Sequence, residues 1–201
     1  TGMTHVSNRS HQVYFSWGYH DAKIALDAGS IARSLLIAGC FLSDSSKNEA
    51  HHKGRMVAEE IRERGVRYII TLLDSSTPAP EFYRFFLQWL VDDSHLGLVI
   101  KSKGEVWKEI RNDGLNGLVE HAFKTNRIHV MDHRSSPADA ASISDFSVSV
   151  TSITPLMVAA LHGSRVIYLD YERVDQGPQK PYCILHSLGS NRCVFYEPDL
   201  L

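Results

Sequence analysis

The chain has 201 residues, of which 43% are hydrophobic and 22% are charged, a composition ordinary for a soluble globular protein of one large or two small domains. The net charge of −2 is spread along the chain rather than gathered in blocks, which argues against nucleic-acid binding. Cys40, Cys183 and Cys193 are odd in number and form no CxxC pair, so we expect reduced thiols in a cytoplasmic protein.

The apolar runs of the sequence are too short to cross a bilayer. The longest, Phe85 to Val91, is interrupted by Gln88, whereas a membrane-spanning helix needs about 20 apolar residues. We therefore expect no transmembrane segment.

The first elements in chain order are short. Residues 1–12 are polar and aperiodic, so we expect no regular structure there. VYFSWG (13–18) predicts a short strand, a weakly helical run follows to Ala28, and SLLIAG (34–39) predicts a second strand. Because these elements are too few to bury one another, we expect them to pack against something else. We assign residues 1–45 to a residual N-terminal or linker segment.

A regular alternation of helices and strands begins after this segment. Glu49 to Arg64 has Met56, Val57 and Ile61 on one side and predicts a long amphipathic helix that Gly65 ends. We expect strands at 66–74, 96–104, 127–133, from 146, at 164–171 and at 192–196. We expect helices between them at 81–91, over most of 105–124, at 137–143, at 155–162 and at 182–188. Near-continuous Val, Ile and Leu runs indicate a parallel sheet covered by helices on both faces. Residues 46–201 are thus predicted to form a Rossmann-like α/β domain.

The stretch from Phe146 to Tyr171 predicts a compact strand–helix–strand unit. Thr154 is a good N-cap, Pro155 suits the first helical position, and Gly163 stands where a left-handed C-cap would close the helix. The free N–H groups of such a helix favour an anion such as phosphate. Three hydroxyls stand beside them, those of Thr151, Ser152 and Thr154. These hydroxyls either contact a ligand or simply cap the helix.

Parallel strands direct their carboxyl ends to one edge of a sheet, where α/β folds bind ligands. That edge is predicted to collect polar residues from four strands, namely Asp74, Ser75, Ser76 and Thr77, then Lys101 and Lys103, then Asp132 and His133, then Thr151, Ser152 and Thr154. Together they suit a nucleotide monophosphate or diphosphate.

Each group also has a simpler interpretation. Asp74 to Thr77 fits a turn with an N-cap, the lysine pair fits a solvated strand end, and Asp132-His133 fits an Asx turn.

Motifs for other chemistries are absent from the sequence. His51 and His52 are adjacent rather than one helical turn apart, and no HExxH occurs, so we expect no metal. No GxSxG, Walker loop or GxGxxG occurs, which disfavours a serine hydrolase, a P-loop NTPase and a Rossmann dehydrogenase. We therefore expect no cofactor.

The order of segments over residues 34–201 resembles the C-terminal, donor-binding half of a GT-B glycosyltransferase of bacterial surface-polysaccharide and O-antigen synthesis. The similar segments are SLLIAGCFLSD, VRYIITLLDSS, LGLVIKSKG, RIHVMDH, DAASISDFSVSVTSITPLMVAALHGSRVIYLDY and NRCVFYEPDLL. VYFSWG resembles the end of the acceptor-binding domain of such enzymes. Where many members carry an acidic residue that grips the ribose, this chain has Val158.

The resemblance implies a function as well as a fold. A nucleotide-activated sugar would place its base near Asp132-His133 and its phosphates near Ser152 and Thr154. The chain would, with an acceptor domain, transfer the sugar to a glycan or lipid-linked acceptor in the cytoplasm or at the inner face of the membrane. The catalytic residues stay unassigned, because most of the acceptor-binding domain has no counterpart in this chain. Alternatives are a GT-B-type epimerase, a polyol-phosphate transferase or a noncatalytic α/β interaction domain, and a homo-oligomer is compatible with each.

Overall fold

The computed structural model describes residues 10–38, 47–74, 80–102, 110, 114–150, 154–169 and 194–195. Its strands form two parallel sheets that have no strand in common. One is a two-stranded sheet near the start of the chain, and the other is a six-stranded sheet built from the later strands.

The two-stranded sheet forms a small β–α–β unit. It comprises β1 (Ser10–Ser16), α1 (Tyr19–Asp27) and β2 (Ile31–Ile37). Strand β1 pairs in parallel with β2 from Ser10 opposite Ile31 to Ser16 opposite Ile37. The prediction that residues 10–12 lack regular structure is therefore wrong, because backbone pairing with β2 holds this segment extended although its side chains are polar.

The six-stranded sheet contains the remaining elements. In chain order they are α2 (Lys47–Arg62), β3 (Tyr68–Leu73), α3 (Pro80–Asp92), β4 (Leu96–Lys101), α5 (Asn116–Lys124), β5 (Ile128–Val130), α6 (Pro137–Ser142), β6 (Phe146–Ser149), α7 (Thr154–Leu161), β7 (Arg165–Leu169) and β8 (Val194–Phe195). The strand order is β5-β4-β3-β6-β7-β8, and every neighbouring pair is parallel. The predicted parallel, Rossmann-like α/β sheet is confirmed. The helix predicted at 182–188 lies outside the described residues.

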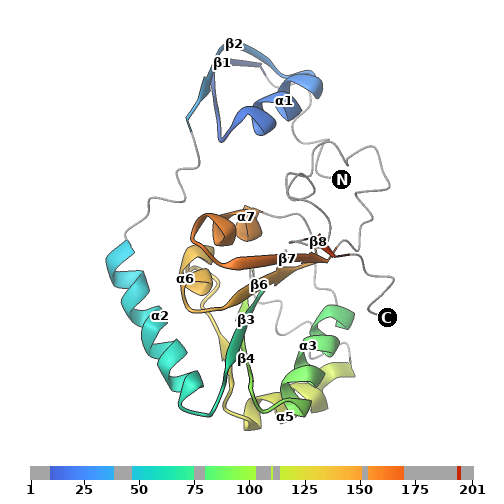
Figure 1. Ribbon diagram of the computed structural model, residues 1–201. Helices are drawn as coiled ribbons and strands as arrows, with labels where there is room; N and C mark the ends of the chain where they lie inside the picture. Colours follow the sequence, from blue (N-terminus) through green and yellow to red (C-terminus); the bar gives the residue numbers. More distant parts are fainter. Residues whose placement is uncertain are drawn as a thin grey trace.

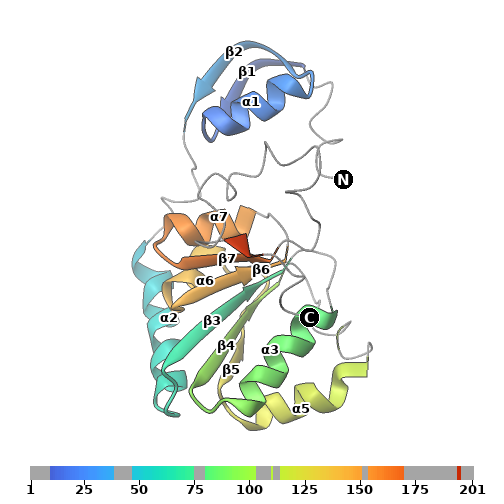
Figure 2. The same cartoon turned by 45° about the vertical axis from the view of Figure 1, so that its right-hand side comes forward.

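Helices cover both faces of this sheet, as the sequence predicts. Helices α2, α6 and α7 lie on one face, and α3 and α5 lie on the other (Figures 1 and 2). Every residue of β4 and all but the first residue of β3 are buried. β3 and β4 are apolar in nearly every position because both of their faces meet helices.

The strand order reverses at the centre of the sheet. The chain runs outward from β3 to β4 and β5, returns through α6 to place β6 beside β3, and then continues outward on the other side to β7 and β8. Such a reversal leaves a crevice at the carboxyl ends of the two central strands, which is the usual ligand site of open α/β sheets.

The unit β6–α7–β7 follows the predicted pattern closely. Helix α7 begins at Thr154, one residue before the predicted start. It ends at Leu161, and Gly163 two residues later has a φ of 83°, in the left-handed region that favours glycine. The N–H of Gly163 donates to the carbonyl of Ala160, and the N–H of Ser164 donates to that of Ala159. These two bonds form the Schellman motif, so the predicted C-cap is confirmed.

Candidate functional site

The candidate site is the edge of the sheet where β3 and β6 end. Asp74 directly follows β3, and Val150 directly follows Ser149, the last residue of β6. On either side of this centre lie the ends of β4 and β7, and beyond β4 lies the end of β5. The topology therefore places the described parts of the predicted residue set at one edge.

Asp74 is a buried carboxylate at this edge, with an exposed fraction of 3%. Its Oδ2 accepts a hydrogen bond of 2.8 Å from the hydroxyl of Tyr83, which lies in the first turns of α3. Burial raises the pKa of Tyr83 well above its usual value, and the charge of Asp74 and this hydrogen bond raise it further. Tyr83 is therefore a permanent hydrogen-bond donor to Asp74 near neutral pH.

Tyr83 was not among the residues that sequence reasoning selected. It lies on the buried face of α3, together with Phe82, Phe86 and Leu87. A signal existed, because a tyrosine at an apolar helix position needs a partner for its hydroxyl, and Asp74 directly follows the strand that precedes this helix.

Lys101 ends β4 and has an exposed fraction of 7%, so the interpretation as a solvated strand end is wrong for this residue. Its Nζ donates to the carbonyl oxygens of Ser102 and His133, each at 3.0 Å. Burial lowers the pKa of Lys101, while the charges of Asp132 and Asp139 oppose the shift. The ammonium thus holds the end of β4 to the loop after β5.

Asp132 and His133 form an exposed turn after β5. The Oδ1 of Asp132 accepts a hydrogen bond of 2.7 Å from the N–H of Arg134, which is an Asx turn. That hydrogen bond lowers the pKa of Asp132, and the nearby charges of His133, Arg134 and Lys101 lower it further. The Nδ1 of His133 lies 3.5 Å from the same carboxylate oxygen. The simpler interpretation of this dipeptide is confirmed, and both side chains still face solvent.

Hydrogen bonds link these residues across three strands. The N–H of Asp74 donates to the carbonyl of Lys101, and Lys101 in turn contacts the carbonyl of His133. Thr154 is exposed at the start of α7, after β6. The remaining predicted residues lie outside the described part of the chain, namely Ser75, Ser76, Thr77, Lys103, Thr151 and Ser152.

Two further residues of the segment that resembles GT-B enzymes lie away from the carboxyl edge of the sheet. Val158, which stands where the resemblance would place an acidic ribose ligand, is a buried residue of α7. Asp145 precedes β6 at the opposite, amino edge of the sheet, where its carboxylate accepts a hydrogen bond from the backbone of Ile69. Neither side chain is therefore placed to contact a ligand at the carboxyl edge.

The described residues contain no candidate for a metal site or a membrane span. Within the described ranges, no group of three or more His, Cys, Asp or Glu side chains is arranged to hold a metal ion. None of the helices in the described part of the chain has the length and hydrophobicity that crossing a bilayer requires. Comparisons of the chain with protein-family models, with curated proteins and with solved structures found no match.

Proposed function

We propose that this chain binds a nucleotide-activated sugar at the carboxyl edge of its six-stranded sheet, as the donor-binding part of a glycosyltransferase of surface carbohydrate synthesis. The observation that carries the proposal is the reversal of strand order between β3 and β6, with polar residues at the ends of both halves. Nucleotides bind at this position in other open α/β sheets.

The helix α7 would supply the contact to phosphate. It starts on the carboxyl side of β6, and the first N–H groups of a helix carry a partial positive charge that favours an anion. The hydroxyl of Thr154 is exposed beside them. In a transfer reaction, the same N–H groups would stabilise the negative charge that grows on the leaving phosphate.

Asp74 and Lys101 would have different roles in such a site. The ammonium of Lys101 already donates to two carbonyl groups, so its main contribution would be its positive charge and the position of the β5 loop. The buried Asp74 carboxylate, which accepts a hydrogen bond from Tyr83, would add a negative charge at the end of β3 and position the start of α3 through that bond. The acceptor would be a glycan or a lipid-linked glycan held by another domain.

Thermal-shift and calorimetric titrations with UDP, GDP and CMP test the proposal. A nucleotide at 100 times its dissociation constant should stabilise the fold by about 2.7 kcal/mol. The matching nucleoside should bind at least about tenfold more weakly, because it lacks the phosphate that α7 would contact. Thr154→Ala should weaken binding several-fold, whereas Ser34→Ala, which removes an exposed hydroxyl from β2, should leave it unchanged. A chain that ignores all three nucleotides contradicts the proposal and favours the noncatalytic interaction domain.

A further inference from the structure

One half of the six-stranded sheet has an open apolar face. A groove with a volume of about 710 Å³ lies beside α3, on the side of the sheet that α3 and α5 cover. Its floor comes from β6 and β7 and includes Phe146, Val148, Ile167 and Leu169. In the described part of the chain, no helix lies over this half of the face (Figure 2).

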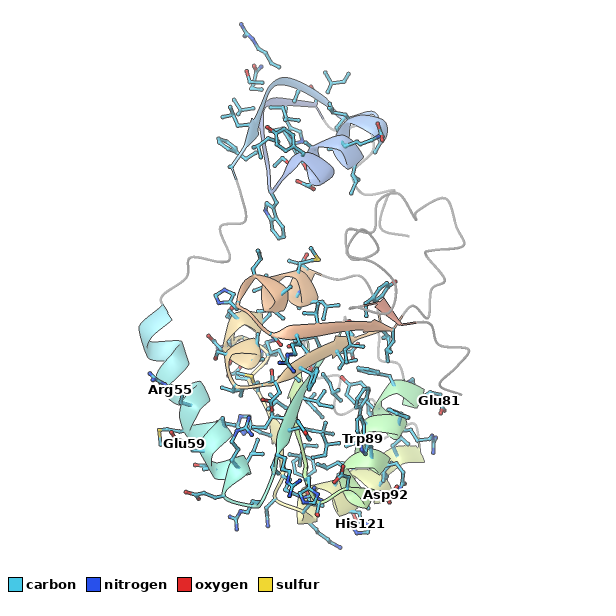
Figure 3. The ribbon with its side chains drawn as sticks, in the orientation of Figure 1. Arg55, Glu59, Glu81, Trp89, Asp92 and His121 are labelled. Carbon is cyan, nitrogen blue, oxygen red and sulfur yellow. The ribbon has the colours of Figure 1, made fainter. Side chains whose placement is uncertain are left out.

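The wall of the groove is an aromatic ridge on α3. Phe85 and Trp89 form it, and they remain 47% and 41% exposed although their rings are in contact at a centroid distance of 6.0 Å. Figure 3 shows Trp89 on α3, between Glu81 near the start of the helix and Asp92 at its end. Large apolar side chains next to an open sheet face mark a surface that binds another protein.

Two opposite charges border the amino end of the groove. Arg165 begins β7, and Asp93 lies between α3 and the start of β4. The guanidinium of Arg165 lies 5.7 Å from the centre of the Phe146 ring, and among the described residues no carboxylate lies within ion-pair distance of it. Asp93 precedes β4 and Arg165 begins β7, and these two strands are equally far from the line between β3 and β6.

We propose that two copies of this chain associate through this face as a two-fold dimer. An axis parallel to the strands, between β3 and β6, exchanges β4 with β7. It places α3 of each copy over β6 and β7 of the other. The same operation brings each Arg165 to the Asp93 of the partner, so both ion pairs form at once.

The face is self-complementary, which favours a second copy as its occupant. Each chain offers one ridge and one open floor, side by side, and one positive and one negative charge in matching places. Two neighbouring strands span roughly 10 Å, which matches the diameter of a helix with its side chains. The apolar lining is also typical of the core of a homodimer interface.

Sedimentation velocity over a range of concentrations tests the dimer. The intact chain should sediment as a dimer at micromolar concentration. Phe85→Glu and Trp89→Glu should each raise the dissociation constant at least about tenfold, because they place a charge in the centre of the interface. Leu161→Glu is the matched control, since this side chain is 58% exposed on α7 at the opposite face and should leave the dimer intact. A chain that is monomeric at every concentration overturns the proposal.

Exchanging the charges of Arg165 and Asp93 tests the two-fold arrangement without changing the aromatic side chains of the interface. Arg165→Asp alone and Asp93→Arg alone should each weaken the dimer, because like charges then meet twice. An equimolar mixture of the two variants should form a heterodimer of nearly wild-type affinity, because one native ion pair and one ion pair with exchanged charges then form. Circular dichroism on each variant checks that it is folded. If both variants dimerise like the wild type, or if the mixture stays monomeric, this two-fold arrangement is wrong.

Discussion

The carboxylate of Asp145 accepts a hydrogen bond of 2.8 Å from the backbone N–H of Ile69, although the two residues are 76 positions apart. The backbone N–H of Asp145 returns the bond to the carbonyl of Ile69, also at 2.8 Å. The same carboxylate accepts from Arg62 at the end of α2. Asp145 therefore joins the two strands on either side of the reversal point, and it links them to the helix that precedes them.

Asp145→Ala should destabilise the fold by about 1 to 3 kcal/mol, because a partly buried N–H of β3 loses its acceptor. Arg62→Met should cost less, since it removes a partly exposed ion pair and an exposed hydrogen bond to the carbonyl of Arg67. Asp27→Ala, which breaks the exposed Lys23–Asp27 pair of α1, is the control and should change stability by less than about 0.5 kcal/mol. Urea unfolding at pH 7 measures all three. Equal effects of Asp145→Ala and Asp27→Ala would show that the strand-joining bond is unimportant.

Tyr83→Phe should destabilise the fold by about 1 to 3 kcal/mol near neutral pH, because the buried Asp74 carboxylate loses a donor. The pKa of Tyr83 is raised in the folded state, so its contribution is complete below the unfolded value near 10 and is lost as the pH rises toward the folded value.

The pH dependence gives a separate test of this pair. Above pH 10 the folded chain retains a proton that the unfolded chain has released. Wild-type stability should then fall more steeply than that of Tyr83→Phe, by up to about 1.4 kcal/mol per pH unit. Urea titrations at intervals from pH 9 to 11 measure the two slopes. Parallel curves for the two proteins would falsify this assignment.

Arg127→Met should destabilise the fold by about 2 to 4 kcal/mol. The guanidinium is buried and donates hydrogen bonds to the backbone carbonyls of Leu90, Asp93 and Leu96. It therefore supplies the donors for carbonyl groups at the end of α3 and the start of β4. Removing it leaves buried acceptors without a partner. Arg127→Lys should recover only part of the loss, because an ammonium lacks the planar fork of donors.

Arg84 offers a matched control for this substitution. Its pair with Glu81 on α3 is exposed, and Arg84→Met should change stability by less than about 0.5 kcal/mol. Thermal unfolding followed by circular dichroism at 222 nm compares the variants. Full recovery with lysine at position 127 would mean that charge alone matters there.

The sheet could be predicted well from the sequence, because local residue patterns mark both where its strands run and where the helices between them end. Apolar runs such as Ile69 to Leu73 mark strands that are covered on both faces, and glycines such as Gly163 mark where helices end. The β1 strand was predicted to begin too late, since its first residues are polar and only pairing with β2 holds them extended. Tertiary pairing of this kind leaves no local pattern in the residues concerned.

The candidate site was less predictable from the sequence than the sheet. The edge at which Asp74, Lys101 and Asp132 lie follows from parallel strands, so their shared location could be predicted. Their partners could not, because the bonds of Lys101 to the carbonyl of His133 and of Asp74 to Tyr83 depend on how loops and helices pack. Residue type suggests a charge at a strand end, but packing decides whether that charge is available to a ligand.

Gly97→Ala should destabilise the fold by about 1 to 3 kcal/mol, because a methyl group has no space at the start of β4. An added Cβ would lie 2.6 Å from Cγ2 of Ile61 and 3.1 Å from Cγ1 of Val66, where α2 and its following loop press on the strand. Gly117→Ala is the matched control on α5. Among the described residues, no atom beyond its chain neighbours and its own helix backbone lies within 4 Å of the added Cβ, so the substitution should stabilise the helix by about 0.5 to 1 kcal/mol.

Urea unfolding measures the effect of the contact between residue 97 and Ile61. The proteins compared are Gly97→Ala, Gly117→Ala and the double variant that carries both Ile61→Val and Gly97→Ala. Ile61→Val removes only the outer methyl of the longer branch of Ile61, so the crowding Cγ2 stays and the double variant should recover little stability. Ile61→Ala removes Cγ2 itself, and its cost should therefore be smaller in the Gly97→Ala background than in the wild type. If the costs of Ile61→Ala and Gly97→Ala simply add, the close approach of α2 to β4 does not limit the size of residue 97.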